Sequence, residues 1–213
     1  MDERERIGDL DALQRALRPC RRCVAAGIRV ESMPVVSGSR DADAILVGQA
    51  PGVRERDNLL PFSGPAGRRL RTWLEPAGLG DEASFYGRLY VAAVVRCFPG
   101  KRAGGSDVRP SAAMVRECVP WLRRELELVP APVVISVGTL ALEELAPGLS
   151  LEDAVGAELR LADGRPLYAL PHPSGASPWP HLPGNGERLE RALALIAGRL
   201  GDGAGGDPPD WHP

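Results

Sequence analysis

Lysine, histidine, phenylalanine and cysteine are scarce in this chain, and long apolar runs are absent. Each of these shortages excludes some classes of protein. Its 213 residues include a single lysine, three histidines, three phenylalanines and four cysteines. No apolar run approaches the roughly 20 residues that span a bilayer. Residues 2–6 are all charged, and no apolar stretch of the kind found in a secretion signal follows them. There is no internal repeat. We therefore expect a cytoplasmic protein without membrane segments, in which cysteines are more often ligands than disulfides.

Bulk composition predicts an ordinary globular protein. Hydrophobic residues make up 44% of the chain and charged residues 25%, which are typical values. A chain of this length can bury a sizeable core. We expect a single domain over residues 1–200 and a disordered tail over residues 201–213, which are rich in Gly, Pro and Asp.

Charge is unevenly distributed along the sequence. The net charge is −2, but residues 54–124 hold 13 Lys and Arg against 7 Asp and Glu, so this stretch carries +6 and the remainder −8. Because a local field attracts phosphates whatever the total charge, the pattern is compatible with nucleic-acid binding. Arginine-rich helix faces that are simply solvated explain it equally well.

Apolar runs alternate with helical patterns, which indicates a parallel sheet covered by helices on both faces. Ligands of such sheets bind beyond the carboxyl ends of the strands. We therefore expect residues 49–62, 97–109 and 172–181, which follow strands, to converge on one crevice. The expected strands are residues 44–48, 89–95, 133–138 and 166–170, with 159–161 as a hairpin partner of the last or a separate strand. The expected helices are residues 9–17, 64–77, 110–126, 139–145 and 186–200, and the expected loops are 49–63 and 98–108.

The cysteines fall into two pairs. Cys20 and Cys23 form a C-x2-C motif, and Cys97 and Cys118 lie in the middle of the chain. Four thiols complete one tetrahedral site, which suits either zinc or an iron–sulfur cluster. Two disulfides are the remaining alternative, and a reducing compartment disfavours them.

Three further segments have the chemistry of a ligand pocket. Gly48–Gly52 follows a strand and opens a loop whose amides can face a carbonyl oxygen or a water molecule. Phe62 lies in a loop between turn signals, where its ring can stack on a flat ligand. His172 directly follows the strand at 166–170. Each alone has a plainer explanation: a common Pro-Gly turn, a phenylalanine folded onto the core, or a structural histidine.

In this order, the segments resemble the uracil-DNA glycosylase superfamily, most closely its iron–sulfur-containing family 4 and family 5 branches. The resemblance runs from Leu17 to about Arg199. Several short motifs in the same order are far more specific than any one of them. The motifs are the C-x2-C pair, Gly48–Gly52, Pro61–Gly67, Val94–Cys97, Cys118 with Pro120–Leu122, and His172–Ser177.

The resemblance implies a three-layer α/β/α sandwich with a central, mostly parallel four-stranded sheet. It implies a monofunctional enzyme that hydrolyses the N-glycosidic bond of uracil or a related damaged base in DNA. In that reading Phe62 stacks the extruded base, His172 stabilises the departing base, and Gln49 with the loop amides contacts the base or the water. The remaining substrate-binding residues would be Gly48, Ala50, Ala93, Ser174 and Ser177, and the [4Fe–4S] ligands, with zinc as the alternative metal, would be Cys20, Cys23, Cys97 and Cys118.

The chain departs from the family pattern where the chemistry is most specific. Family 4 members usually carry Glu at the position of Gln49, and family 1 members carry a water-activating Asp at the position of Ala50. Family 4 also has a uracil-reading Asn at the position of Ala92 or Ala93. No obvious carboxylate is therefore available to orient the water. The candidates, chosen only because their loops lie nearby in sequence, are Glu55, Asp57 and Asp107.

These departures leave several hypotheses open. Loss of the Asn removes a bidentate contact to uracil of roughly 1–3 kcal/mol, so the preferred base could be hypoxanthine, xanthine or hydroxymethyluracil. A catalytically weak or inactive lesion-binding protein and a zinc-stabilised nucleotide-binding module are the rivals. The partner we expect is single- or double-stranded DNA with a damaged base, bound by a nucleoid-associated monomer. Lys101 is a poor imine nucleophile in a basic loop, which disfavours a lyase step.

Overall fold

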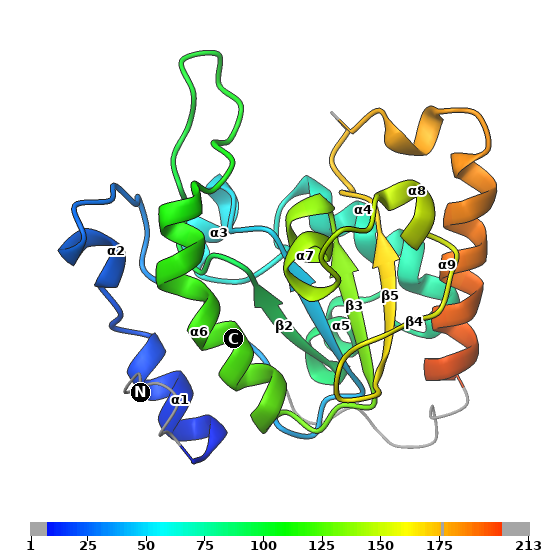
Figure 1. The fold of residues 1–213 in the computed structure, drawn as a ribbon, viewed down its shortest axis with the longest axis horizontal. Helices are drawn as coiled ribbons and strands as arrows, with labels where there is room; N and C mark the ends of the chain where they lie inside the picture. The colour runs from blue at the N-terminus through cyan, green and yellow to red at the C-terminus, as the bar shows by residue number, and fades with distance from the viewer. Residues whose placement is uncertain (1–7, 176, 202–213) are drawn as a thin grey trace.

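The computed structural model describes residues 8–175 and 177–201 (Figure 1). The charged N-terminal segment and all but the first residue of the predicted C-terminal tail lie outside the described residues. Within the described ranges, no helix combines the length and the apolar character needed to cross a membrane.

The core of the fold is a sheet with the strand order β2-β1-β3-β5-β4. The first four of these strands are parallel, as the alternation of strands and helices predicts, and β4 runs antiparallel to β5. The sheet thus has one strand more than the predicted four, because the short segment before β5 forms its hairpin partner. The strands are β1 (Ala44–Gly48), β2 (Leu89–Ala93), β3 (Val133–Val137), β4 (Leu159–Arg160) and β5 (Pro166–Leu170).

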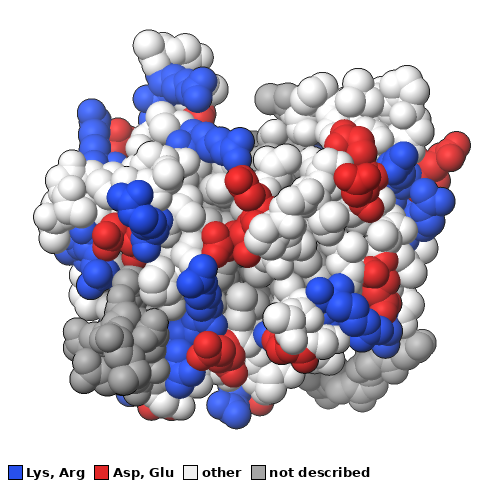
Figure 2. Space-filling view, in the orientation of Figure 1, with Lys and Arg blue, Asp and Glu red and all other residues white. Residues whose placement is uncertain are grey.

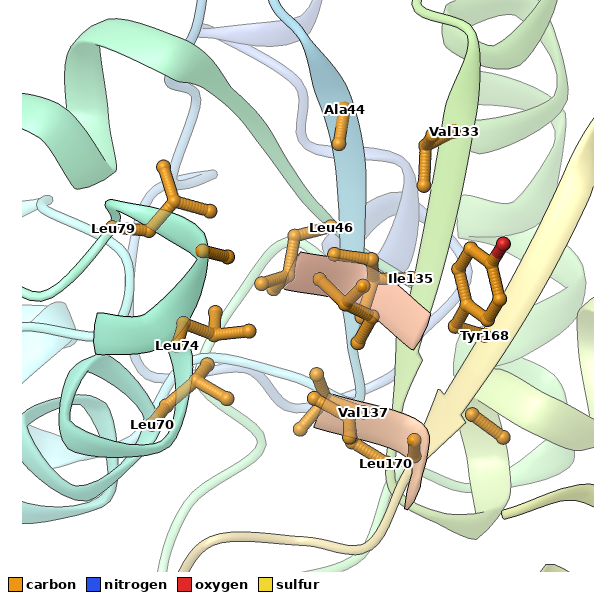
Figure 3. Packing of buried hydrophobic residues seen from close by; sticks show 14 of the residues in the cluster. Ala44, Leu46, Leu70, Leu74, Leu79, Val133, Ile135, Val137, Tyr168 and Leu170 are labelled. Carbon is orange, nitrogen blue, oxygen red and sulfur yellow. The ribbon is translucent and has the colours of Figure 1, made fainter. Parts of the chain in front are cut away.

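Alternate side chains of the strands point into two separate hydrophobic layers. Leu46 of β1 packs in one cluster and its neighbours Ile45 and Val47 in the other. Figure 3 shows the first layer, in which Leu46 and Ile135 of the sheet face Leu70 and other leucines of the covering helices. This arrangement is the predicted three-layer sandwich.

The helices divide between these two layers (Figure 1). The layer that contains Leu46 is covered by α4 (Pro65–Leu74), η2 (Glu75–Ala77), α5 (Glu82–Arg88), α8 (Leu151–Ala154), η3 (Trp179–His181) and α9 (Asn185–Leu200). The layer that contains Ile45 is covered by α1 (Leu10–Leu17), α6 (Ala112–Leu128) and α7 (Thr139–Leu145), while α2 (Arg22–Ala25) holds Cys23 and α3 (Val53–Asn58) follows β1.

Side-chain caps fix where several helices begin. The carboxylates of Asp9 and Asp81 accept a hydrogen bond from the backbone N–H three residues later, as do the hydroxyls of Ser111 and Ser150. Such caps contribute about 1 kcal/mol each. They set the starts of α1, α5, α6 and α8, of which α1 and α6 were predicted within a few residues.

The expectation of a continuous loop over residues 49–63 is wrong, because α3 lies within it. None of the side chains of α3 is buried, so the segment lacks the apolar stripe by which a helix is recognised in a sequence. The helix ends at Asn58, and the next residue, Leu59, caps it with a left-handed φ of 55°. The chain therefore turns sharply before it reaches Phe62.

Candidate active site

The segments that follow β1, β2 and β5 meet in a cavity of about 770 Å³ beyond the carboxyl ends of the strands. Figure 2 shows the surface notched on this side, between a protruding loop and the lobe formed after β5. Ser177, by contrast, lies outside the lining, where its N–H donates to the carbonyl oxygen of Ser174 at 3.0 Å. The predicted residues that line the cavity are Gly48, Gln49, Ala50, Phe62, Ala93, His172 and Ser174.

The turn that begins at Gly48 is held by the sheet itself. The N–H groups of Val94 and Val95 donate to the carbonyl oxygens of Gly48 and Gln49 at 2.9 and 3.0 Å, which extends the ladder between β1 and β2 past the last paired residues. Gln49 therefore lines the cavity from a rigid backbone.

Phe62 is held in a conformation that most residues avoid. Its φ is 53°, in the left-handed region that costs free energy for a residue with a Cβ. A Cβ added to Gly67 would lie 1.6 Å from the carbonyl oxygen of Phe62, and one added to Gly48 would lie 2.9 Å from its Cζ. The absence of these two side chains lets the Phe62 backbone approach α4 and lets its ring lie against the end of β1.

Hydrogen bonds and one aromatic contact anchor the loop around Phe62. The Glu55 carboxylate accepts hydrogen bonds from the N–H groups of Gly52 at 3.1 Å and Gly64 at 2.9 Å, which ties the two ends of the segment together. Tyr86 donates its hydroxyl to the carbonyl oxygen of Pro61 at 2.9 Å. The Phe62 ring also meets that of Phe85 edge to face, with centroids 6.4 Å apart.

His172 presents a neutral imidazole to the cavity. Its Nδ1 accepts a hydrogen bond from the N–H of Ser174 at 3.2 Å, so the proton of the neutral ring resides on Nε2, which remains a donor. Burial lowers the pKa of His172, and the charge of Asp107 opposes this effect. Gly138, with a φ of 86°, supports the ring: a Cβ there would lie 3.5 Å from the imidazole Cδ2.

Of the three nearby carboxylates suggested by the sequence, two line the cavity and one does not. Glu55 and Asp107 are part of the lining. Asp57 is exposed and pairs with Arg56 at 2.7 Å. The three carboxylates therefore differ in whether they border the cavity, a difference that no local sequence pattern predicts.

A buried ion pair under the cavity is a feature that the sequence motifs did not reveal. The side chains of Arg96 and Glu125 are 2% and 0% exposed and are hydrogen-bonded to each other. Tyr90 donates its hydroxyl to the second carboxylate oxygen of Glu125 at 2.7 Å. The sequence does contain a sign of this pair. Glu125 interrupts the apolar face of α6, and Arg96 closely follows a buried strand.

The four cysteines surround a second, much smaller cavity of about 10 Å³. The backbone N–H of Arg96 donates to the Sγ of Cys118 at 3.2 Å. All four cysteines are free, and burial raises the pKa of the Cys97 and Cys118 thiols to about 12. The fold therefore gathers the C-x2-C pair and the two distant thiols around one point.

The chemistry of this second cavity fits a thiophilic metal, although its geometry is not that of a finished site. Four thiols with an N–H···S hydrogen bond are a donor set that suits zinc or an iron–sulfur cluster. Among the described residues, however, no group of His, Cys, Asp or Glu side chains is arranged to hold a metal ion. Thiols bind metals as thiolates, so occupation would require loss of their protons and a widening of the cavity.

Comparisons with known proteins agree with the fold and the pocket. The family model of the uracil DNA glycosylase superfamily matches residues 35–195, most of the chain, so the chain belongs to this superfamily. The matched region includes Gly48, Phe62 and His172 but not the C-x2-C pair.

Individual relatives fall in two branches of the superfamily. The type-4 uracil-DNA glycosylase of Archaeoglobus fulgidus is 30% identical over 132 residues, which are 62% of this chain and 61% of that protein. The type-4 enzyme of Pyrobaculum aerophilum is 26% identical over 64% of each chain. The type-5 uracil-DNA glycosylase of the same organism is 35% identical over 40% of this chain and 36% of its own. The match thus spans about three fifths of the length of the type-4 relatives.

Proposed function

We propose that the protein is a monofunctional DNA glycosylase that removes uracil or a related damaged base and leaves an abasic site. One observation carries the proposal: an aromatic ring, Phe62, and a neutral imidazole, His172, line the same cavity at the carboxyl edge of the sheet. The similarity to type-4 and type-5 uracil-DNA glycosylases supports the choice of reaction.

The cavity offers the contacts that an extruded base needs. Stacking on an aromatic face contributes about 1–3 kcal/mol per base, which offsets part of the cost of unstacking the base from the duplex. The Nε2–H of His172 would donate to the carbonyl oxygen on which negative charge develops as the C1′–N bond breaks. Gln49 and the amides of the Gly48–Gly52 turn would hold the base or the attacking water.

Basic residues at the rim of the cavity suit the DNA backbone. Arg54, Arg69 and Lys101 are part of the lining, and Figure 2 shows blue side chains on the protruding loop that contains Lys101 and Arg102. Contacts of this kind supply most of the sequence-independent affinity of proteins for DNA. Ser174 and Ser177, in the segment after β5, would contact phosphates or the space left by the flipped base.

We further propose that Cys20, Cys23, Cys97 and Cys118 hold a [4Fe–4S] cluster, with zinc as the alternative. The cluster would tie the segment before β1 to α6 and to the start of the protruding loop. Its role is structural in this proposal, since the cysteine cavity is separate from the base pocket. The protein would act as a monomer on the DNA of the cytoplasmic nucleoid.

The nature of the residues at positions 49, 50 and 93 favours a second candidate function. Gln49 and Ala50 offer no carboxylate for the water, and Ala93 offers no side-chain amide for the Watson–Crick edge of uracil. The protein could accordingly prefer hypoxanthine, xanthine or hydroxymethyluracil, or bind lesions with little turnover. These alternatives use the same pocket and differ in the base that it accepts or in whether the base is removed.

A substrate panel tests the proposal. Purified protein would be incubated with single- and double-stranded oligonucleotides that each carry one of these bases, and abasic sites would be revealed by alkaline cleavage. We expect cleavage at one or more of the lesions and none at undamaged bases. Iron, sulfide and zinc would be quantified in the same preparation. Absence of product from metal-loaded protein would refute catalysis, and tight lesion-dependent binding without product would favour the lesion-binding alternative.

A further inference from the structure

We propose that Asp107 is the carboxylate that orients and deprotonates the attacking water, in place of the acidic residue missing at positions 49 and 50. The inference rests on the proposed glycosylase function and adds to it a residue role. It assigns to the loop between Cys97 and Cys118 a part in the chemistry as well as in holding DNA.

The position of Asp107 is fixed by a small hairpin. Lys101 and Asp107 form an antiparallel bridge, and the N–H of Val108 donates to the carbonyl oxygen of Gly100 at 2.8 Å. At the tip, the N–H of Arg102 donates to the carbonyl oxygen of Ser106 at 2.8 Å. Figure 1 shows this loop protruding above the start of α6, at the same edge of the sheet as the strand ends. Asp107 therefore lies at the base of the hairpin, beside the cavity that it lines.

The carboxylate of Asp107 lies over the turn that follows β1. A Cβ added to Gly52 would be 3.2 Å from its Oδ2, so the oxygen approaches the Gly48–Gly52 segment across the space left by a glycine. Family 4 members, in the resemblance described above, carry their glutamate in this turn at the position of Gln49. Asp107 thus places an acidic group next to the same turn from a different part of the chain.

The other two carboxylates are unsuited to this role. Both oxygens of Glu55 already accept backbone hydrogen bonds, from Gly52 and Gly64, so it serves to hold the loop. Asp57 pairs with Arg56 and is not part of the lining, whereas Asp107, which is also exposed to solvent, borders the cavity. Among the described residues, no hydrogen bond reaches the side-chain oxygens of Asp107, which leaves them available to a water molecule.

The electrostatic surroundings raise the pKa of the Asp107 carboxyl above its ordinary value. Partial burial raises the pKa of Asp107, Glu55 raises it further, and Lys101 and His172 oppose the shift. A base whose pKa lies nearer the working pH takes up a proton more readily in the transition state. Asp107 and His172 influence each other electrostatically in both directions, as expected of groups that share one pocket.

The step balances with water as the only co-reactant. As the C1′–N bond breaks, its electron pair passes to the base, whose carbonyl oxygen accepts the Nε2–H hydrogen bond of His172. A lone pair of the water oxygen forms the new bond to C1′, and one water proton passes to the Asp107 carboxylate. The proton then returns through solvent to the base anion, so the products are the neutral base and a sugar hydroxyl.

The test compares Asp107→Asn and Asp107→Glu with the wild type in single-turnover excision of whichever base the wild type removes. Loss of a general base costs about 10²–10⁴ in rate, so we expect a fall of at least 100-fold for D107N and partial recovery for D107E. The acid limb of the wild-type rate–pH profile should be absent from D107N. Affinity for lesion-containing DNA should be unchanged or higher, since a negative charge is removed. Asp57→Asn is the matched control and should react at the wild-type rate.

Each outcome decides the matter. Wild-type activity with a D107N rate within threefold of it would overturn the role of Asp107 and leave the proposed function standing. A D107N defect confined to DNA affinity, with the rate of bound substrate unchanged, would also overturn it. A wild type that excises none of the bases would overturn the proposed function and this inference together. Circular dichroism and the metal content of each variant would show that the fold is intact.

Discussion

The two cavities of this molecule lie on either side of one side chain and are built by opposite means. The larger holds about 770 Å³ and the cysteine cavity about 10 Å³, and Arg96 is part of the lining of both. The larger cavity is shaped by glycines that allow backbone segments to approach each other, as at Gly48 and Gly67. The smaller one is shaped by four thiols brought together from three separate segments of the chain.

This difference predicts that substitutions in the larger cavity and in the cysteine cavity affect different properties of the protein. Residues of the larger cavity, such as His172, leave donors and acceptors available to a ligand, so their substitution should affect rate more than stability. The cysteine cavity is small and is lined by all four thiols, so substitution of a cysteine should affect assembly of the fold more than the rate. Arg96 lines both cavities and is buried in an ion pair with Glu125, so this pair should contribute to the stability of both regions.

The largest effect should come from breaking this shared ion pair. Glu125→Ala leaves Arg96 buried without its counter-charge and Tyr90 without its acceptor. Loss of one partner of a buried pair costs about 3–5 kcal/mol, and denaturant unfolding would measure it. Glu143→Ala is the control, because Glu143 pairs with Arg109 on the surface at 3.4 Å, where ion pairs contribute less than about 1 kcal/mol. Equal losses for the two variants would contradict the importance of the buried pair.

The next largest effect should separate catalysis from stability. His172→Ala removes the proposed donor to the departing base, and such donors contribute about 10²–10³ in rate, or 2.7–4 kcal/mol. We expect single-turnover excision to slow by that factor. The midpoint of denaturant unfolding should move far less than in Glu125→Ala. A variant that excises at the wild-type rate would remove His172 from the mechanism.

A smaller effect should come from the glycine beneath Phe62. Gly67→Ala places a methyl group 1.6 Å from the carbonyl oxygen of Phe62, so the loop must shift. Overpacking of this kind costs about 1–3 kcal/mol, and we expect weaker lesion binding as the ring moves. Gly198→Ala, in the exposed part of α9 with open space around it, should instead stabilise by about 0.5–1 kcal/mol. Similar stability of both variants would contradict the close approach at Gly67.

The smallest effect should appear in the pH dependence of stability. Because burial lowers the pKa of His172, the unfolded chain binds a proton at this residue first as the pH falls below about 6.5. The contribution of His172 to the unfolding free energy is therefore complete above that pH and is lost as the pH falls. The stability difference between the wild type and His172→Gln should shift against the wild type from pH 7 to pH 5. A difference that is constant, or that grows in favour of the wild type, would contradict the lowered pKa.

The long apolar elements of the fold were predictable from the sequence, and the short polar ones were not. β1 and α7 match the predicted ranges because an apolar run or a helical stripe marks each of them. α3 buries nothing, and the two-residue strand β4 exists only through its pairing with β5. Elements of this kind depend on tertiary contacts that no local pattern encodes.

For the site, motif reasoning found groups next to strand ends and missed groups that reach the cavity from elsewhere. Gln49 and His172 follow β1 and β5 directly, so their convergence follows from a parallel sheet. The place of Asp107 depends on a hairpin, and that of Arg96 on a partner in α6. From the sequence, Asp107 was only one of three candidate carboxylates. A sequence does not show which of these carboxylates already accept hydrogen bonds or form ion pairs within the protein. The predicted ligand and contact roles of the cysteines and of Ser177 remain predictions.

The guanidinium of Arg88 donates to the carbonyl oxygen of Leu200 at 2.8 Å, which attaches the last turn of α9 to the start of β2. This attachment lies at the amino edge of the sheet, opposite the strand ends that border the larger cavity (Figure 1). A fluorophore or surface tether joined at Gly201, just after Leu200, would consequently face away from a duplex that is bound as proposed. Immobilised protein should keep full access to long DNA.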